Sequence, residues 1–352
     1  MEKLQYYVMK TGMEMFDVCR AYGLGLVLDA LREEGEEVTI ISDSGIYYSV
    51  EGAEITKPEI DRLEPYFSPG PSWNKVFLTI RRQASRDKKV NIAKTILINK
   101  DKMNQILENH KKCVAVKDSS NKETLYQSMD LVGTKGYRVP VRRKANYTEG
   151  SSMKVTSEAW ALAVLGEAHF SIWKGGKALT SIIPKPERVL IMHWKDIRNS
   201  VDQMRVNRTS ISATLAHLAT LLVKEVRGRK KSGDPFMDVF SSLIYGAMIK
   251  TGTQWKPARG GMFPVDFLYD LIRSDSEISG DIFELWSHVF RIGNGKGRED
   301  LSLSLSEFIA YPTSESIEKY FKVHLRYLLQ DDVPIRAYPD ECIKEILKNV
   351  RS

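Results

Sequence analysis

The sequence predicts an α+β protein in which a mixed α/β domain, residues 1–197, is followed by an all-α helical-bundle domain, residues 198–352. Two patterns support this fold class. The first part mixes helical segments with short runs rich in β-branched and aromatic residues, whereas the second repeats apolar residues at helical spacing between short Gly, Pro or Ser breaks. A chain of 352 residues also has the length of about two domains.

The first expected element is a helix over residues 11–34, because apolar side chains recur there at helical spacing. Gly35 follows it as a C-terminal stop. Gly23 and Gly25 lie inside this helix and weaken it by about 1 kcal/mol each relative to alanine. Two glycines in an otherwise good helix indicate either a close approach by another backbone or a kink.

A β-hairpin is expected next, because two β-rich runs, residues 38–41 and 46–50, flank the short turn Asp43-Ser44-Gly45. The remaining elements of the first part include an edge strand, since Pro140 cannot donate a hydrogen bond within a sheet. In chain order we expect a short helix at 57–66, a strand or helix start at 76–80, a helix at 91–111, the edge strand at 137–142, an apolar helix at 157–170 and a buried strand at 189–193.

The second part is expected to be a bundle of amphipathic helices. The first of them is long and carries apolar residues at helical spacing over residues 198–227. The others are expected at 238–250, 264–273, 281–291, 315–329 and 340–350.

Composition excludes several classes of protein. The three cysteines, Cys19, Cys113 and Cys342, are odd in number and far apart, so we expect no disulfide framework and a reducing, cytoplasmic location. The first seven residues contain no apolar run of the signal-peptide type. The longest apolar stretches, residues 24–31 and 159–165, are much shorter than the roughly 18–20 residues that span a bilayer. We therefore expect a protein that does not bind membranes.

Charge is strongly segregated along the chain. The net charge of +7 divides into −8 for residues 1–72, +11 for 73–149, +9 for 150–264 and −5 for 265–352. The middle of the chain, at +20, predicts a polyanionic partner, and the acidic ends predict contacts with solvent or with other proteins. The alternative is that the acidic ends fold back over the basic middle and neutralise it.

Four clusters of basic residues, interleaved with glycine and aromatic residues, predict a nucleic-acid-binding surface. Lysine and arginine contact phosphates, glycine lets a backbone approach closely, and aromatic rings stack on unpaired bases. Any single cluster is equally compatible with a solvated loop. The predicted contact residues are Arg81, Arg82, Arg86, Lys88 and Lys89; Lys135, Arg138, Arg142, Arg143 and Lys144; Arg227, Arg229, Lys230 and Lys231; and Lys256 and Arg259.

The sequence lacks a recognisable catalytic or metal-binding motif. The glycine-rich segments 293–298 and 175–177 do not have the spacing of a Walker phosphate loop. The six histidines include no i, i+4 pair and no cysteine partner at zinc-ligand spacing. We therefore expect no enzyme activity, metal or cofactor. One alternative stays open, because Arg188 and His193 match the R-x4-H pattern of a class of helical ribonucleases.

Three segments, residues 21–28, 38–50 and 232–238, resemble the large subunit of the archaeal type I-A CRISPR surveillance complex, Cascade. The resemblance implies a non-catalytic subunit that binds guide RNA and target DNA, reads the protospacer-adjacent motif and serves antiviral defence. It also implies contacts with the Cascade backbone and small subunits, and recruitment of a helicase–nuclease. In such systems base pairing reads the sequence, so the protein needs mainly backbone contacts. A basic cytosolic scaffold that binds acidic proteins is a further alternative.

Overall fold

The computed structural model describes residues 4–35, 38–70, 73–76, 78–80, 86–112, 123–126, 154–175, 179–229, 237–252, 254–330 and 333–351. The chain forms two compact units, each built from two stretches. Unit 1 comprises Met1–Arg198 and Ile244–Met262, and unit 2 comprises Asn199–Leu243 and Phe263–Ser352. The expected division at residue 197 places the second stretch of unit 1 in the other domain.

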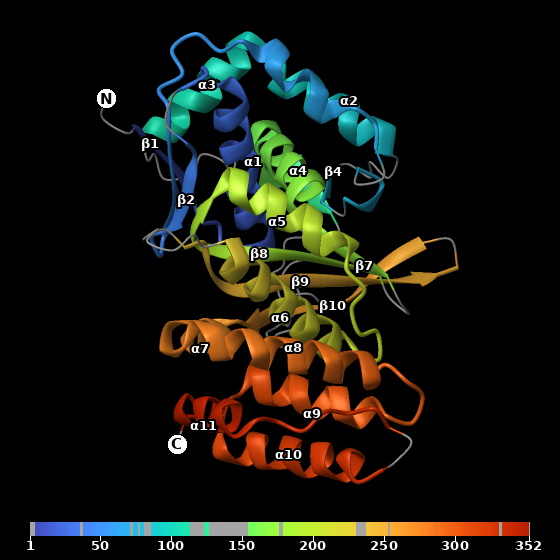
Figure 1. The fold of residues 1–352 in the computed structure, drawn as a ribbon. Coiled ribbons are helices and arrows are strands. Elements are labelled where there is room, and N and C mark those ends of the chain that lie inside the picture. The colour runs from blue at the N-terminus through green and yellow to red at the C-terminus, as the bar shows by residue number, and fades with distance from the viewer. Residues whose placement is uncertain are drawn as a thin grey trace, which may run out of the picture. The chain divides into compact units, whose positions relative to one another are not determined.

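The fold is mixed α/β, as expected, and its main sheet has seven strands among the described residues (Figure 1). Their order is β1-β3-β2-β8-β9-β10, and β7 pairs with β8 as a branch. The strands are β1 (Leu4–Met9), β2 (Ile40–Asp43), β3 (Tyr47–Gly52), β7 (Ile172–Gly175), β8 (Leu179–Leu190), β9 (Val239–Thr251) and β10 (Gln254–Pro264). A smaller sheet contains β4 (Thr79–Ile80), β5 (Glu123–Tyr126) and β6 (Lys154–Val155).

The predicted hairpin is confirmed by the antiparallel pairing of β2 with β3, in which Asp43 lies opposite Tyr48. The turn depends on Gly45, whose φ of +82° is the left-handed conformation that favours glycine. Asp43 holds the turn, because its Oδ1 accepts a hydrogen bond from the Gly45 N–H at 2.8 Å.

The core of unit 1 is built around α1 (Glu14–Leu31) and α4 (Ser157–Phe170), which pack directly on each other (Figure 1). A Cβ atom on Gly23 would lie 2.0 Å from the carbonyl oxygen of Leu162, and one on Gly166 would lie 1.9 Å from that of Cys19. The two helix backbones therefore touch at these glycines. Of the two expectations for the first helix, the close backbone approach is the one confirmed.

Two helices occupy the segment in which one helix was expected at 91–111. They are α2 (Arg86–Leu97) and α3 (Lys100–Lys111). Asn99 separates them, because its extended backbone ends one helix and its side chain accepts a hydrogen bond from the Lys102 N–H at 3.0 Å to begin the next. The short helix expected at 57–66 is the 3-10 helix η1 (Ile60–Phe67), which another 3-10 turn, η2 (Trp73–Lys75), follows.

Two boundaries differ from the expectation. The strand expected at 189–193 ends at Leu190, and α5 (Ile191–Gln203) begins immediately after it. The long helix expected at 198–227 is interrupted by a loop over residues 204–210, and α6 (Ile211–Arg229) follows. Val201, Leu215, Leu218, Leu222 and Val226 are buried, whereas Met204 and Ile211, at the two ends of the loop, are only half-buried. The helical spacing of apolar residues therefore continued across a loop that contains neither Gly nor Pro.

The prediction of a helix at 238–250 is wrong, because residues Val239–Thr251 form the strand β9. Phe240, Leu243, Ile244, Ala247 and Met248 are all at most 1% exposed. A strand buried on both faces lacks the apolar–polar alternation that identifies a half-buried strand, so its apolar residues match a helical pattern by chance. The second part of the chain is therefore not all-α.

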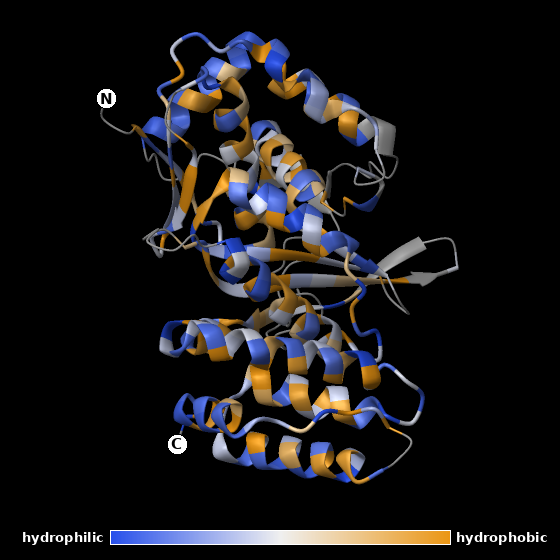
Figure 2. Cartoon of the chain, viewed as in Figure 1, coloured by the Kyte–Doolittle hydropathy of each residue, from blue (hydrophilic) through white to orange (hydrophobic). Residues whose placement is uncertain are grey.

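Unit 2 contains, besides α6, the helices α7 (Asp266–Ser274), α8 (Ser276–Ile292), α9 (Glu299–Ala310), α10 (Ser314–Leu328) and α11 (Asp340–Lys348). Figure 2 shows apolar and polar residues interleaved along them, as expected of amphipathic helices. An aromatic cluster fills the core, with Phe308 stacked on Tyr320 and edge-on to Trp286. The expected helices at 264–273, 281–291, 315–329 and 340–350 correspond to α7, α8, α10 and α11.

The helix α9 had no counterpart among the expected elements. Its sequence, Leu301-Ser302-Leu303-Ser304-Leu305-Ser306, alternates as a strand does. Each serine hydroxyl instead donates to the carbonyl oxygen three residues earlier, at 2.8–3.1 Å. These local bonds let buried serines stay in a helix without an unpaired hydroxyl.

Candidate nucleic-acid interface

Most of the sixteen predicted contact residues lack a described side chain. Arg81, Arg82, Lys135, Arg138, Arg142, Arg143, Lys144, Lys230 and Lys231 lie outside the described residues, and so does the edge strand expected at 137–142. Arg86 and Lys88 lie on α2, and Lys256 lies on β10. Lys89, Arg227, Arg229 and Arg259 are fully described.

Lys89 belongs to the interior of unit 1 and not to its surface. The side chain is 5% exposed, and its Nζ donates to the carbonyl oxygen of Val76. Burial lowers the pKa of Lys89, and the buried carboxylate of Glu167 opposes that shift. Glu167 also accepts a hydrogen bond from the Leu78 N–H at 3.2 Å. The predicted phosphate contact at Lys89 is therefore wrong, because phosphate cannot reach a buried ammonium group.

The three described arginines of the predicted clusters differ in what they offer. The Arg227 guanidinium is half-buried, donates to the carbonyl oxygen of Ser276 and occupies the space over Gly280, so it packs α6 against α8. Arg229 is exposed at the end of α6, with its Nε 3.9 Å from a carboxylate oxygen of Glu225. Arg259 is exposed on β10. Two of these side chains therefore remain accessible to a nucleic acid.

A further group of cations is assembled by the fold of unit 2 and was missed in the sequence. Arg205 and Arg208 lie in the loop between α5 and α6, and Arg291 and Lys296 lie at the end of α8 and in the loop after it. All four are exposed, and none has a carboxylate partner within 4 Å among the described residues. We call this group, together with Asn294, the two-loop surface.

A pocket of about 410 Å³ lies in the two-loop surface and is lined by Arg205, Val206, Arg208 and Asn294. The lining combines guanidinium groups with an amide, and both donate hydrogen bonds to phosphate oxygens. A phosphodiester therefore fits the chemistry of this pocket.

The α5–α6 loop is held in place by the buried Asn207, which is 1% exposed. Its Nδ2 donates to the carbonyl oxygen of Phe290 at 2.8 Å, and its backbone N–H donates to Nδ1 of His217 at 3.0 Å. Its Oδ1 accepts from both the N–H and the hydroxyl of Thr209, at 2.9 and 2.6 Å. Asn207 thus fixes the loop to α8 through its side chain and to α6 through its backbone N–H.

The two loops are also joined directly. The Arg208 N–H donates to Oδ1 of Asn294 at 2.9 Å, and the hydroxyls of Thr209 and Ser302 lie 3.2 Å apart. Glycine is required at Gly293, where a Cβ would lie 2.8 Å from Ser302, and at Gly297, whose φ is +82°. The glycine-rich segment 293–298 therefore serves close loop packing, although it lacks the Walker spacing.

The alternative catalytic pair is split between two elements of unit 1. Arg188 is exposed on β8, whereas His193 is half-buried in the first turn of α5. The strand β8 ends between them, at Leu190.

A second polar cluster, in unit 1, is electrically balanced. The Lys10 Nζ lies 2.6 Å from Asp43, and the Lys185 Nζ lies 3.5 Å from both Asp43 and Glu14. The Tyr48 hydroxyl donates to Glu14 at 3.5 Å, and burial, supported by the nearby carboxylates, raises the pKa of Tyr48. Two lysines matched by two carboxylates leave little net charge to attract a phosphate.

The part of the chain that the structure describes holds neither a metal cluster nor a membrane span. Within it, no three His, Cys, Asp or Glu side chains gather in a way that would hold a metal ion. None of the helices described there combines the length and apolar character needed to cross a bilayer.

Comparison with known proteins identifies a relative of similar length but no matching family model. No family model matches the chain. An uncharacterized protein from Archaeoglobus fulgidus is 35% identical over 354 aligned residues, which cover 98% of each chain. Identity at this level over the whole length shows common descent, so the chain belongs to the family of this Archaeoglobus fulgidus protein.

Proposed function

We propose that the protein binds nucleic acid through its phosphate backbone and does so without catalysing a reaction. The two-loop surface carries this proposal, because it has four exposed cations without carboxylate partners among the described residues, and two of them, Arg205 and Arg208, line a pocket of about 410 Å³. Arginine forks bind phosphate oxygens in pairs, and lysine adds a point charge. The net charge of +20 over residues 73–264 provides the long-range attraction.

At a finer level, we propose the role that the sequence resemblance implies. The protein would then be the large subunit of a type I-A CRISPR surveillance complex, located in the cytoplasm and active in antiviral defence. Its partners would be guide RNA, target DNA, the Cascade backbone and small subunits, and a helicase–nuclease. The resemblance of residues 21–28, 38–50 and 232–238 supports this role.

The first experiment measures binding of the full chain to labelled duplex and single-stranded DNA by fluorescence anisotropy at increasing salt. The test variant is Arg205→Glu with Arg208→Glu. We expect a loss of at least about tenfold in affinity, and a salt slope that falls by about 2, since each lost phosphate contact removes about 0.9.

The matched control is Lys344→Glu with Lys348→Glu, an equal charge change on α11 of the same unit. We expect the control to change the affinity less than about threefold, because a distant surface charge is screened by salt. An equal loss in both double variants, or a flat salt response of the wild type, would contradict nucleic-acid binding at the two-loop surface.

The finer proposal has a separate test. The protein is assembled with a guide RNA and the other complex subunits, and binding to targets with and without the flanking motif is compared. We expect tighter binding when the motif is present. Equal affinity for targets with and without the motif would contradict the Cascade role, but it would not contradict the binding of nucleic acid by the two-loop surface.

A further inference from the structure

The loop after α8 contains the pair Asn294-Gly295, and Asn–Gly occurs only once in the sequence. Asn294 is exposed and lines the pocket of the two-loop surface together with Arg205 and Arg208. An asparagine followed by glycine is especially prone to lose its side-chain amide, because glycine has no Cβ atom to hinder its backbone nitrogen. This reactive pair therefore lies in the pocket to which phosphate binding is assigned.

We propose that Asn294 is a site of spontaneous deamidation, and that the carboxylate formed there weakens the binding of nucleic acid by the two-loop surface. The backbone nitrogen of Gly295 attacks Cγ of Asn294 and forms a five-membered succinimide ring. The side-chain nitrogen takes up the proton of the Gly295 N–H and leaves as ammonia. Water then opens the ring to aspartate or isoaspartate, and either product carries one negative charge more than the asparagine.

The structure of the loop bears on both partners of the attack. Oδ1 of Asn294 accepts a hydrogen bond from the Arg208 N–H at 2.9 Å, which stabilises the negative charge that develops on this oxygen as Cγ is attacked. The attacking nitrogen must first leave a hydrogen bond, since the Gly295 N–H donates to the carbonyl oxygen of Ile292 at 3.0 Å. This bond belongs to a turn beyond the end of α8, so a local fluctuation of the loop is enough to break it.

Asn199 provides a reference within the same chain. It is also exposed, and the small residue Ser200 follows it. Both residues lie inside α5, so the Ser200 nitrogen reaches the neighbouring side chain only if the helix opens. We therefore expect Asn199 to keep its amide under conditions in which Asn294 loses it.

A carboxylate at residue 294 opposes phosphate binding, and this part of the inference rests on the proposed function. The carboxylate competes with phosphate for the guanidinium groups of Arg205 and Arg208, which line the same pocket, and it repels phosphate oxygens. In the aspartate form the Arg208 N–H keeps an acceptor at residue 294, so the two loops stay joined. The aspartate form therefore changes the charge of the pocket and preserves the contact between its loops.

The first experiment incubates the full chain at mildly alkaline pH and follows the two asparagines by mass spectrometry. Trypsin releases residues 292–296 and residues 199–205 as separate peptides, because each begins after an arginine and ends in lysine or arginine. Chromatography separates the asparagine, aspartate and isoaspartate forms of each peptide. We expect the amide in 292–296 to be lost at least about tenfold faster than that in 199–205.

The variant Gly295→Ala tests the attack itself. Its methyl group hinders the backbone nitrogen, so we expect deamidation of Asn294 to slow by about tenfold. The position tolerates the change, since the φ of Gly295 is not in the left-handed region and a Cβ would lie 3.3 Å from the Ile292 carbonyl oxygen. After incubation the wild type should have lost affinity for DNA in proportion to its deamidated fraction, whereas Gly295→Ala should retain its affinity.

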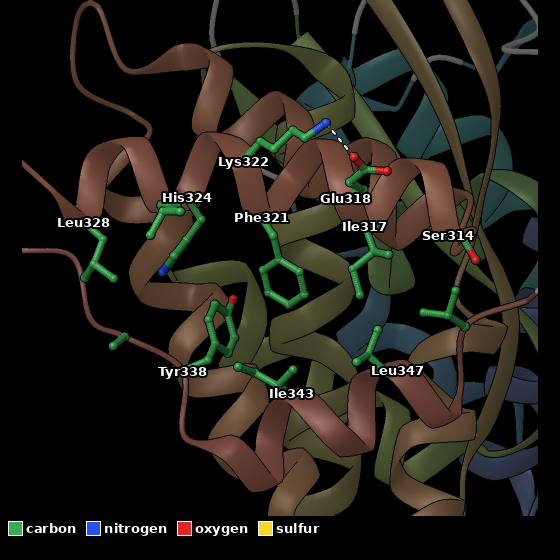
Figure 3. A pocket seen from close by; sticks show the side chains of 13 residues that line it. Ser314, Ile317, Glu318, Phe321, Lys322, His324, Leu328, Tyr338, Ile343 and Leu347 are labelled. Atoms are coloured by element: carbon green, nitrogen blue, oxygen red, sulfur yellow. Dashed lines mark ion pairs between the residues drawn. The ribbon is translucent and has the colours of Figure 1, made fainter.

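The variant Asn294→Asp supplies the product directly, and we expect it to weaken DNA binding by about tenfold in fluorescence anisotropy. The matched control is Ser314→Asp, which adds a negative charge on the rim of the apolar hollow between α10 and α11 (Figure 3). Ser314 precedes Tyr327 by thirteen residues along α10, and the Tyr327 hydroxyl donates to the Gly297 carbonyl oxygen at 3.0 Å. The helical rise places Ser314 about 20 Å from that contact, beyond the Debye length of about 8 Å, so its effect should be less than about twofold.

Different results would overturn the two parts of the inference. Equal loss of amide from the two peptides, or from the wild type and Gly295→Ala, would contradict Asn294 as the deamidation site. Equal affinities of the wild type and Asn294→Asp would contradict the effect of the charge. A fresh wild type that binds no DNA would contradict the proposed function and with it the charge effect, while the peptide masses decide the deamidation by themselves.

Discussion

At Gly166 and Gly23 the backbones of α4 and α1 touch, which leaves no room for a methyl group. We expect Gly166→Ala to destabilise the protein by at least about 2 kcal/mol, since a Cβ there would lie 1.9 Å from a carbonyl oxygen and the helices would have to separate. The midpoint of urea unfolding, followed by circular dichroism, measures the change.

Gly228 provides the control for this prediction. It lies on α6 with open space where the methyl group of an alanine would stand, and its φ is not in the left-handed region. Gly228→Ala is expected to stabilise the protein slightly, by up to about 0.5 kcal/mol, through helix propensity. Similar losses in both variants would show that packing at Gly166 is not the cause.

The imidazole of His169 gives a prediction about pH. Burial lowers the pKa of His169 to about 4, and the nearby Arg198 and Lys195 act in the same direction. The ring is held by Tyr66, whose carbonyl oxygen lies 2.8 Å from Nε2. Since the unfolded chain has the ordinary pKa of about 6.5, this contribution to stability is present above pH 6.5 and is lost as the pH falls toward 4.

We expect the loss to be about 2 kcal/mol between pH 7 and pH 4, allowing for the ring's partial contact with solvent. His169→Gln removes the titration and should flatten the pH dependence over this range. Urea unfolding of both proteins at several pH values provides the measurement. Parallel pH profiles for the two proteins would exclude His169 as the source.

Among the helices, α2 and α3 are separated by two residues, Ile98 and the capping residue Asn99. We expect Asn99→Ala to cost about 1 kcal/mol, because the Lys102 N–H loses its hydrogen-bond acceptor at 3.0 Å. The matched variant Asn104→Ala, at an exposed position within α3, removes the same amide without removing a cap and should be neutral or slightly stabilising. Equal changes in the unfolding midpoint would argue against the cap.

Strong local signals predicted several elements correctly. The β2–β3 hairpin follows from the turn at Gly45, and α4 begins and ends as expected because its apolar run is bounded by the cap Thr156 and by Ser171. The elements that failed are those whose local pattern conflicts with their environment. Burial on both faces gave β9 a helical pattern, and alternating Leu and Ser gave α9 the pattern of a strand.

Over the whole molecule, the distribution of charge along the chain predicts which basic residues contribute most to DNA binding, and charge-reversal variants test this prediction. Charge reversal at Arg142, Arg143 and Lys144 should weaken DNA binding more than reversal at Lys344 and Lys348. The first group lies in the +11 part of the chain, and the second lies in the −5 part, so only the first adds to the attracting field. Equal losses of affinity by anisotropy would show that the division by sequence does not describe the folded surface.

The two-loop surface shows why the division of net charge by sequence segment does not fully describe the charge on the folded surface. Arg205 and Arg208 belong to the +9 part of the chain, whereas Arg291 and Lys296 belong to the −5 part. Folding joins them through Asn207, whose bonds to Phe290 and His217 depend on contacts that sequence spacing does not reveal. Lys89 shows the opposite error, since membership in a basic cluster says nothing about burial.

The two-stretch construction of unit 1 has a consequence for how the chain acquires its structure. The stretch Ile244–Met262 contributes most of β9 and β10 to the sheet, and it is synthesised only after α6 of unit 2. Until β9 is synthesised, β8 is an unpaired edge strand, and such a strand can pair with the strands of other chains and aggregate. A fragment ending at residue 197 would keep that edge permanently, so a soluble fragment of unit 1 requires β9 and β10 to be joined to it by a linker that replaces residues 199–238.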